Sequence, residues 1–177
     1  MRVDARIEGL EAAQQALARL RESGAKLRPV MAVIAQDLES STKLRFTDGR
    51  GPDGKPWLPL SAATRISRAK RAAGGKVYVK NRTRTTAAFT RAFLGGMQPL
   101  LDTGRLRNSI TSRASNDFAE VGTATVYARI HQFGGKAGRG RKVTIQARPF
   151  IGMSADDRAL VVERLRAHLV AASGGGR

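Results

Sequence analysis

Few residues in this chain of 177 have the types and spacing that catalysis needs. There are two histidines, His131 and His168, and neither lies at the spacing of a metal-ligand pair. The lack of cysteine excludes disulfides and thiolate metal sites. His168 lies beside an apolar stripe, so we interpret it as a half-buried helix residue, and we interpret His131 as a hydrogen-bonding hinge residue. The sequence therefore predicts no metal ion and no cofactor.

A glycine-rich loop comes close to a phosphate-binding motif. Residues Gly49 to Lys55 fit the pattern G-x-x-x-x-G-K, but Pro56 stands where the motif needs a hydroxyl group for a magnesium ion. The residues before the loop have a helical pattern, whereas the motif follows a strand, so we reject nucleotide binding. Asp48 and Asp53 share this loop without the spacing of a calcium site. They are too few for the clustered carboxylates of a metal-dependent nuclease, and we predict that the protein is not an enzyme.

Positive charge is the dominant feature of the composition. There are 32 basic and 14 acidic residues, a net charge of +18, and most of the excess lies in residues 40–93 and 134–150. Charge concentrated in this way favours a polyanionic partner over basic loops that only keep the protein in solution. The candidate contact residues for DNA or for an acidic neighbour are Arg65, Arg68, Lys70, Arg71, Lys76, Lys80, Arg82, Arg84, Arg91, Lys136, Arg139, Arg141 and Lys142.

Helical patterns occupy the two ends of the chain. Residues 2–8 indicate a weak edge strand, and residues 10–20 and 29–46 have apolar stripes at helical spacing. These stripes are candidates for a subunit interface or for packing on the chain's own sheet. Ser154 can cap the last helix with Asp157 three residues later. The buried stripe of that helix is expected to consist of Val161, Leu165, Leu169 and Ala172.

The middle of the chain mixes basic loops with short elements. Ser61 can cap a helix that runs to about residue 73. Residues 74–98 are basic and weakly patterned, with a short strand at 77–79 and a short helix at 86–94, and we expect order there only against a partner. Alternation over 106–113 and 118–121 predicts a hairpin. A short helix at 126–133 and a strand at 143–146 follow.

These elements predict an α+β fold, in which N-terminal helices and a C-terminal helix pack on a small, mostly antiparallel sheet with long basic loops. The length suits one domain over residues 1–172, with a basic insertion at about 73–98 and a flexible tail at 173–177. No run of residues approaches the ~20 apolar residues of a membrane span, so we expect no membrane contact.

Several short motifs, in their order along the chain, resemble the phage virion morphogenesis family, the tail completion proteins of Mu-like phages. They are LDTGRL at 101–106, VGT at 121–123, YA at 127–128, HQFGG at 131–135 and ARPF at 147–150, with a weaker match at Phe46 and residues 52–60. The motifs extend over about two thirds of the chain. Residues 73–98 do not match the family pattern, which is why we interpret them as an insertion.

The resemblance implies a structural virion protein in the tail or neck, assembled in the host cytoplasm. It implies a homo-oligomeric ring, often of six subunits, which ends the tail at the side near the head and makes it competent to join the head. Tail tube or sheath proteins, head–tail connector proteins and DNA in the lumen are the expected partners. Candidate interface residues are Trp57, Arg105, Arg148 and Phe150. The simpler interpretation of Trp57 is that it holds its loop against the core. The simpler interpretation of Phe150 is that it packs inside the chain. The alternative function is a free-standing nucleic-acid-binding protein without sequence preference.

Overall fold

The computed structural model describes residues 27–80 and 84–174, without the side chains of residues 172–174. The expected elements at 2–8 and 10–20, Arg82 and most of the predicted tail lie outside these residues. In chain order the described elements are α2 (Arg28–Asp48), α3 (Ala62–Ala72), α4 (Ala87–Leu94), α5 (Arg105–Asn108), β1 (Thr111–Ala114), β2 (Ala119–Gly122), α6 (Ala128–Phe133), β3 (Gly135–Ala137), the 3-10 turn η1 (Arg139–Arg141), β4 (Val143–Ile145) and α7 (Ala155–Gly174). The predicted α+β class is confirmed.

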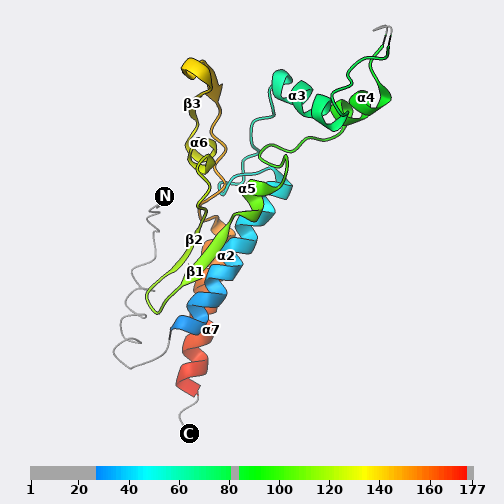
Figure 1. Ribbon diagram of the computed structural model, residues 1–177. Coiled ribbons are helices and arrows are strands. Elements are labelled where there is room, and N and C mark those ends of the chain that lie inside the picture. Colours follow the sequence, from blue (N-terminus) through cyan, green and yellow to red (C-terminus); the bar gives the residue numbers. More distant parts are fainter. Residues whose placement is uncertain (1–26, 81–83, 175–177) are drawn as a thin grey trace.

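Two long helices form an elongated body. Helices α2 and α7 lie antiparallel, and the β1–β2 hairpin covers α2 (Figure 1). Leu27, Met31 and Ile34 pack against Leu165 of α7 in one buried cluster. The apolar stripe of the first described helix therefore packs within the chain, against α7 as well as against Ala114 and Ala119 of the β1–β2 hairpin, whereas packing on the sheet alone was expected.

The strands form two separate antiparallel pairs in the described part of the chain, rather than one sheet. β1 pairs with β2, with Thr111 opposite Gly122, and β3 pairs with β4, with Gly135 opposite Ile145. β3 was not predicted, because its three residues have no alternation of polar and apolar side chains. The predicted strand at 77–79 forms only an isolated bridge between Tyr78 and Thr85.

The strand predicted from residue 106 is wrong over its first half. Residues 105–108 form α5, in which the N–H of Asn108 donates to the carbonyl of Gly104 at 2.9 Å. Leu106 and Ile110 are both buried, and a spacing of four residues places them on one face of a helical turn. Alternation and helical spacing coincide in so short a segment, and burial decides for the turn.

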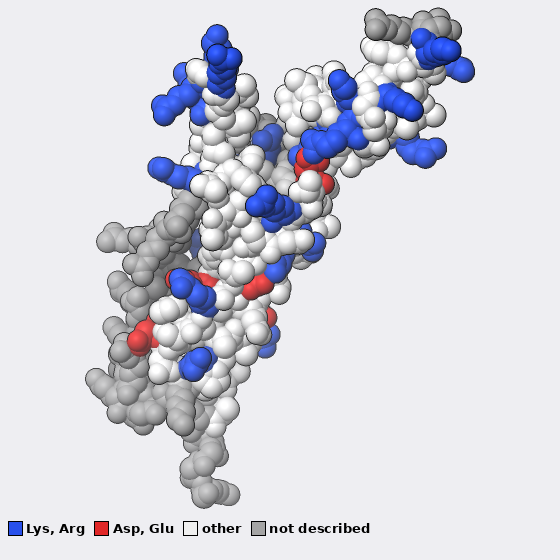
Figure 2. All heavy atoms as spheres, in the orientation of Figure 1, with Lys and Arg blue, Asp and Glu red and all other residues white. Residues whose placement is uncertain are grey.

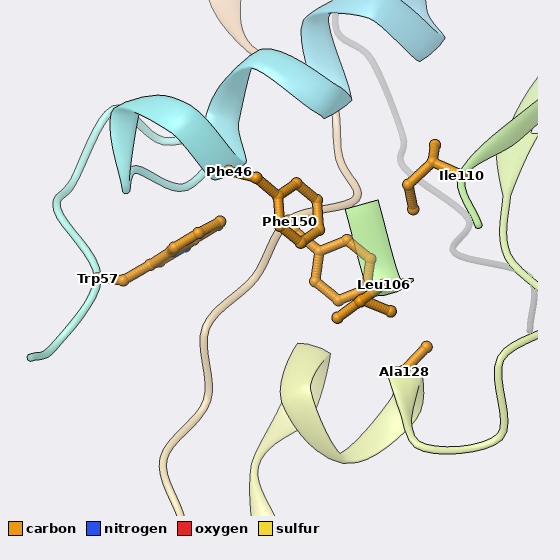
Figure 3. Packing of buried hydrophobic residues seen from close by; sticks show 6 residues of the cluster. All are labelled: Phe46, Trp57, Leu106, Ile110, Ala128 and Phe150. Carbon is orange, nitrogen blue, oxygen red and sulfur yellow. The ribbon is translucent and has the colours of Figure 1, made fainter. Parts of the chain in front are cut away.

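The second cluster of buried residues lies where α2, α5, α6 and the segment after β4 meet. Its members are Phe46, Trp57, Leu106, Ile110, Ala128 and Phe150 (Figure 3). The rings of Phe46 and Trp57 meet edge to face at 5.6 Å between centroids. The family-like motifs therefore converge on one junction, from which the rest of the chain extends.

Two projections leave this junction at the same end of the molecule (Figure 1). We call α3, α4 and their connections the arm, residues 58–101, and we call β3, η1 and β4 the tip, residues 135–145. In the arm, Thr86 caps α4 and Arg65 of α3 donates to the carbonyl of Phe93 at 3.0 Å. The expectation that residues 74–98 take order only against a partner is therefore wrong for 74–80 and 84–98.

Local capping predictions are confirmed at both of the tested helix starts. The N–H of Thr64 donates to Ser61 Oγ at 3.2 Å, and α3 follows at Ala62. The N–H of Asp157 donates to Ser154 Oγ at 3.1 Å, while that of Ser154 donates to Asp157 Oδ2 at 2.8 Å. This reciprocal pair is a capping box, which satisfies backbone donors that the helix itself leaves unpaired.

Gly134 lies where α6 ends and the tip begins, and we expect it to tolerate no side chain. Its φ is +74°, and a Cβ atom there would lie 3.0 Å from both the Ile145 carbonyl oxygen and the Ala147 nitrogen. We predict that Gly134→Ala lowers the free energy of unfolding by about 2–4 kcal/mol, from backbone strain and forced displacement together. Urea denaturation followed by circular dichroism measures this.

Gly54→Ala is the matched control, because Gly54 has a φ of +75° but a Cβ atom added there would meet nothing within 4 Å. We expect it to cost about 1 kcal/mol, from the left-handed conformation alone. Equal losses in the two variants would contradict the contact with Ile145 and Ala147.

Candidate functional site

The ARPF motif is held by hydrogen bonds to the loop after α2. Trp57 Nε1–H donates to the carbonyl of Pro149 at 2.8 Å. Arg148 Nε–H donates to the carbonyl of Leu58 at 2.9 Å, and its Nη2 donates to that of Pro59 at 3.0 Å. Each bond spans about ninety residues of sequence, so the base of the arm is fastened to the segment that follows the tip.

The side chain of Gln132, in the HQFGG motif, binds the same segment from the other side. Its Oε1 accepts from the backbone N–H groups of Phe150 at 2.9 Å and Ile151 at 3.1 Å, and its Nε2 donates to the carbonyl of Ile151 at 2.8 Å. Gln132 is buried, and it replaces the strand partner that this stretch of backbone lacks. Sequence reasoning assigned no role to Gln132, although its place within a family-like motif was a signal.

Arg45 joins three segments at the junction. Its Nη1 donates to the carbonyls of Phe150 at 2.9 Å and Gly152 at 2.8 Å, and its Nη2 pairs with the carboxylate of Asp157 and contacts Ser41 Oγ at 3.3 Å. Both charged side chains are buried. Sequence reasoning missed this arginine, yet it continues the buried stripe of α2 three residues after Thr42.

The ionisation of Asp157 is set by these neighbours. Burial by itself would raise the pKa of Asp157, but hydrogen bonds with Ser41 and Ser154 and the positive charge of Arg45 outweigh burial and hold the pKa below its usual value. The carboxylate is therefore charged at neutral pH, and it forms an ion pair with the guanidinium group beside it.

His131 lies in the junction as a neutral residue. Burial lowers the pKa of His131, and the positive charges of Arg148 and Arg68 lower it further. Its Nδ1 is buried without a hydrogen-bond partner in the described part of the chain, while its carbonyl accepts from the backbone N–H of Arg148 at 2.7 Å. The predicted hydrogen bond of this residue is thus made by its backbone and not by its ring.

The four candidate interface residues differ in exposure. Trp57, Arg148 and Phe150 are buried, with Phe150 at 0% exposure, and the polar contacts described above are all within the chain. Only Arg105, in the first turn of α5, is exposed. An interface role for the four residues stays a prediction. Because Phe150 is fully buried, a neighbouring subunit could touch only the residues that cover it.

Three of the basic candidates on the arm are bound within the chain. Arg65 lies over the ring of Phe93 at 4.7 Å from its centroid. Arg68 and Arg71 both approach Asp102, at 3.6 Å and 2.7 Å, so the carboxylate of the LDTGRL motif fastens α3 to the junction. These three side chains are less available to a polyanion than their charge suggests.

The other described candidates are exposed and have no hydrogen bond or ion pair from their side chains to any described residue. On the arm they are Lys70, Lys76, Lys80, Arg84 and Arg91, and on the tip they are Lys136, Arg139, Arg141 and Lys142. Figure 2 shows the basic side chains gathered at the ends of the two projections, while basic and acidic side chains mix over the body. The structure therefore brings two distant charged stretches of the sequence to one end of the molecule.

Comparison with known proteins points to the same family as the short sequence motifs. The model of the phage virion morphogenesis family matches residues 9–93 and 95–170. The chain belongs to this family. It is 34% identical over 164 residues to Mu-like prophage FluMu G protein 2 of Haemophilus influenzae, which covers 93% of this chain and 94% of the relative. No solved structure matches the chain.

Family membership gives this virion morphogenesis protein an association with the phage particle. The family match covers residues 73–93 and 95–98, where the short motifs gave no resemblance. The interpretation of residues 73–98 as an insertion stays a prediction. Among the described residues, no helix is long and apolar enough to span a membrane, and no three potential metal-binding side chains of His, Cys, Asp or Glu gather in one place.

We predict that Asp157→Asn lowers the free energy of unfolding by about 3–5 kcal/mol at neutral pH, because it leaves the Arg45 guanidinium buried without a counter-charge. Asp156→Asn is the matched control, since Asp156 is an exposed carboxylate in the same first turn of α7. Chemical denaturation of both variants measures the difference. Similar losses in the two variants would show that the buried ion pair contributes little.

The same pair makes the stability depend on acid pH. The pKa of Asp157 is lower in the folded protein than in the unfolded chain, so its contribution is complete above the unfolded value of about 3.9 and is lost as the pH falls through the folded value. The wild-type protein should therefore lose stability below about pH 4 more steeply than Asp157→Asn. Parallel curves of melting temperature against pH would contradict this assignment.

Proposed function

We propose that the protein is a tail completion subunit, which forms a ring at the head-proximal end of a phage tail and makes the tail competent to join the head. Membership of the phage virion morphogenesis family over almost the whole chain is the observation that carries this proposal. The similarity to a Mu-like prophage protein along nearly the full length of both chains supports it. Six copies per ring is the number expected.

The surface of the isolated chain supports an assembled state. Large apolar side chains are exposed on the body, the arm and the tip, and they include Leu44, Leu94, Val126 and Phe133. Val126 is 95% exposed and Leu94 is 73% exposed. An elongated subunit with apolar residues at several places suits contacts with more than one neighbour. The proposed neighbours are further copies, tail tube or sheath proteins, and head–tail connector proteins.

Positive charge constrains how such a ring can close. Subunits of net charge +18 repel one another unless the basic loops face DNA or an acidic neighbour. We place the projections toward the channel or the head connector, where they would face DNA or an acidic neighbour. A tail or neck position in the virion, with assembly in the host cytoplasm, is part of the same proposal.

Native mass spectrometry of the purified protein, alone and with tail tube protein, tests the proposal. We expect a closed oligomer at six times the chain mass of 19.0 kDa, and electron microscopy should show a ring with a central channel. Antibody labelling of assembled phage should locate the protein at the head–tail junction. A protein that stays monomeric under both conditions and is missing from virions would overturn the proposal.

The exposed cations of the arm and tip favour one alternative, a free-standing nucleic-acid-binding protein without sequence preference. It would be absent from virions while the isolated monomer binds DNA tightly and in a salt-sensitive way. Our proposal retains the expectation that the protein is not an enzyme. A divalent-metal-dependent nuclease activity that is lost on Asp48→Asn or Asp53→Asn would contradict that expectation.

A further inference from the structure

We propose that the arm and the tip together bind the phosphate backbone of one DNA duplex, without reading its sequence. We call the exposed cations of both projections that have no ion pair with a described residue the basic fork, namely Lys70, Lys76, Lys80, Arg84 and Arg91 of the arm and Lys136, Arg139, Arg141 and Lys142 of the tip. This inference deepens the proposed function, on which it rests for the source of the duplex, but binding itself does not require the ring.

The tip presents its charge on a turn with no compensating group. Residues 134–147 hold four basic residues and no acidic one. Gly138 and Gly140 have φ values of +77° and +67°, which allow the tight turn that exposes Arg139 and Arg141. Short turns at the end of a two-stranded ribbon can approach a phosphate backbone closely.

The arm has the same imbalance over a longer stretch. Residues 58–101 contain no aspartate or glutamate. Asp102, at the base of the arm, is already bound by Arg68 and Arg71. The exposed cations further out therefore remain without an ion pair to any described residue, and they are available to an anionic ligand.

Another copy of this chain cannot supply that counter-charge from its body. Helix α2 carries three basic and three acidic residues, and so does α7. By sequence, residues 1–26 hold five basic and four acidic residues. With no negatively charged segment of matching size in the chain, the partner of the basic fork is a different, polyanionic molecule.

The composition of the basic turn within the tip favours nucleic acid over an acidic protein, although Val143, the next residue along the chain, is exposed. Residues 136–142, KAGRGRK, contain no aromatic or large aliphatic side chain. Protein interfaces rely on buried apolar and aromatic anchors and are depleted in lysine, whereas phosphate contacts need only lysine, arginine and backbone N–H groups. A duplex is also long enough to meet both projections, which lie at the same end of the molecule (Figures 1 and 2).

The test is the salt dependence of binding to two short DNA duplexes of unrelated sequence, measured by fluorescence anisotropy. The tip variant carries Lys136→Ser, Arg139→Ser, Arg141→Ser and Lys142→Ser. The arm variant carries Lys76→Ser, Arg84→Ser and Arg91→Ser. The matched control removes exposed cations from the body instead, by Arg28→Ser, Arg158→Ser and Arg166→Ser. Circular dichroism establishes that each variant is folded.

We expect the wild type to bind both duplexes equally, with a steep fall in affinity as salt rises. The slope of log affinity against log salt should decrease by about 1 for each phosphate contact removed, in the tip variant and in the arm variant alike. The control should keep the wild-type slope. An unchanged slope in either projection variant would overturn joint binding by the basic fork.

A competition experiment distinguishes nucleic acid from an acidic polypeptide as the partner. Poly-glutamate at equal charge concentration should displace the duplex poorly, and displacement as effective as by unlabelled DNA would overturn the choice of nucleic acid in favour of an acidic polypeptide. Native mass spectrometry of the same variants keeps this test distinct from that of the proposed function. Rings whose DNA binding ignores both projections refute the inference alone, while fork-dependent binding by a protein that never assembles refutes the ring alone.

Discussion

A guanidinium group buried between three segments holds the centre of this protein together. Arg45 lies near the end of α2, donates to two carbonyls of the chain after β4, and pairs with Asp157 in the capping box of α7. A buried charge is costly unless it is paired and hydrogen-bonded, and here both Nη atoms of Arg45 have acceptors and Asp157 supplies the counter-charge. The cost makes the arrangement specific, since displacement of one segment would leave the buried guanidinium group without its carbonyl acceptors or without its counter-charge.

The junction around Arg45 is built from side chains that substitute for a sheet. In the described part of the chain the strands are short and lie in separate pairs, so they cannot by themselves align the segments that meet there. Gln132 binds the backbone of residues 150 and 151 as a neighbouring strand would, and Trp57 and Arg148 fasten the loop after α2 to the same segment. Bonds between residues so distant in sequence give a firm centre to a small, elongated molecule.

The junction lies between the apolar core of the body and the basic surfaces of the arm and the tip. The body buries the apolar residues and carries mixed charges, while the arm and the tip carry the positive excess away from it (Figure 2). Asp102 contributes to this division, because it ties Arg68 and Arg71 to the base of the arm and leaves the outer cations exposed.

The sequence by itself determined the features that depend on near neighbours. The caps at Ser61 and Ser154, the helices they start and the hairpin follow from local hydrogen bonds and backbone sterics. The short motifs predicted family membership correctly, because their order can be read from the sequence without knowledge of the contacts that they make. Only the tertiary structure decided that residues 105–108 form a helical turn, that Arg45 and Gln132 hold the junction, and that the two basic stretches lie at one end. Each of these depends on contacts between segments that are separated in the sequence, by 18 residues for Gln132 and Phe150 and by 105 for Arg45 and Phe150. No local pattern of side chains encodes such contacts.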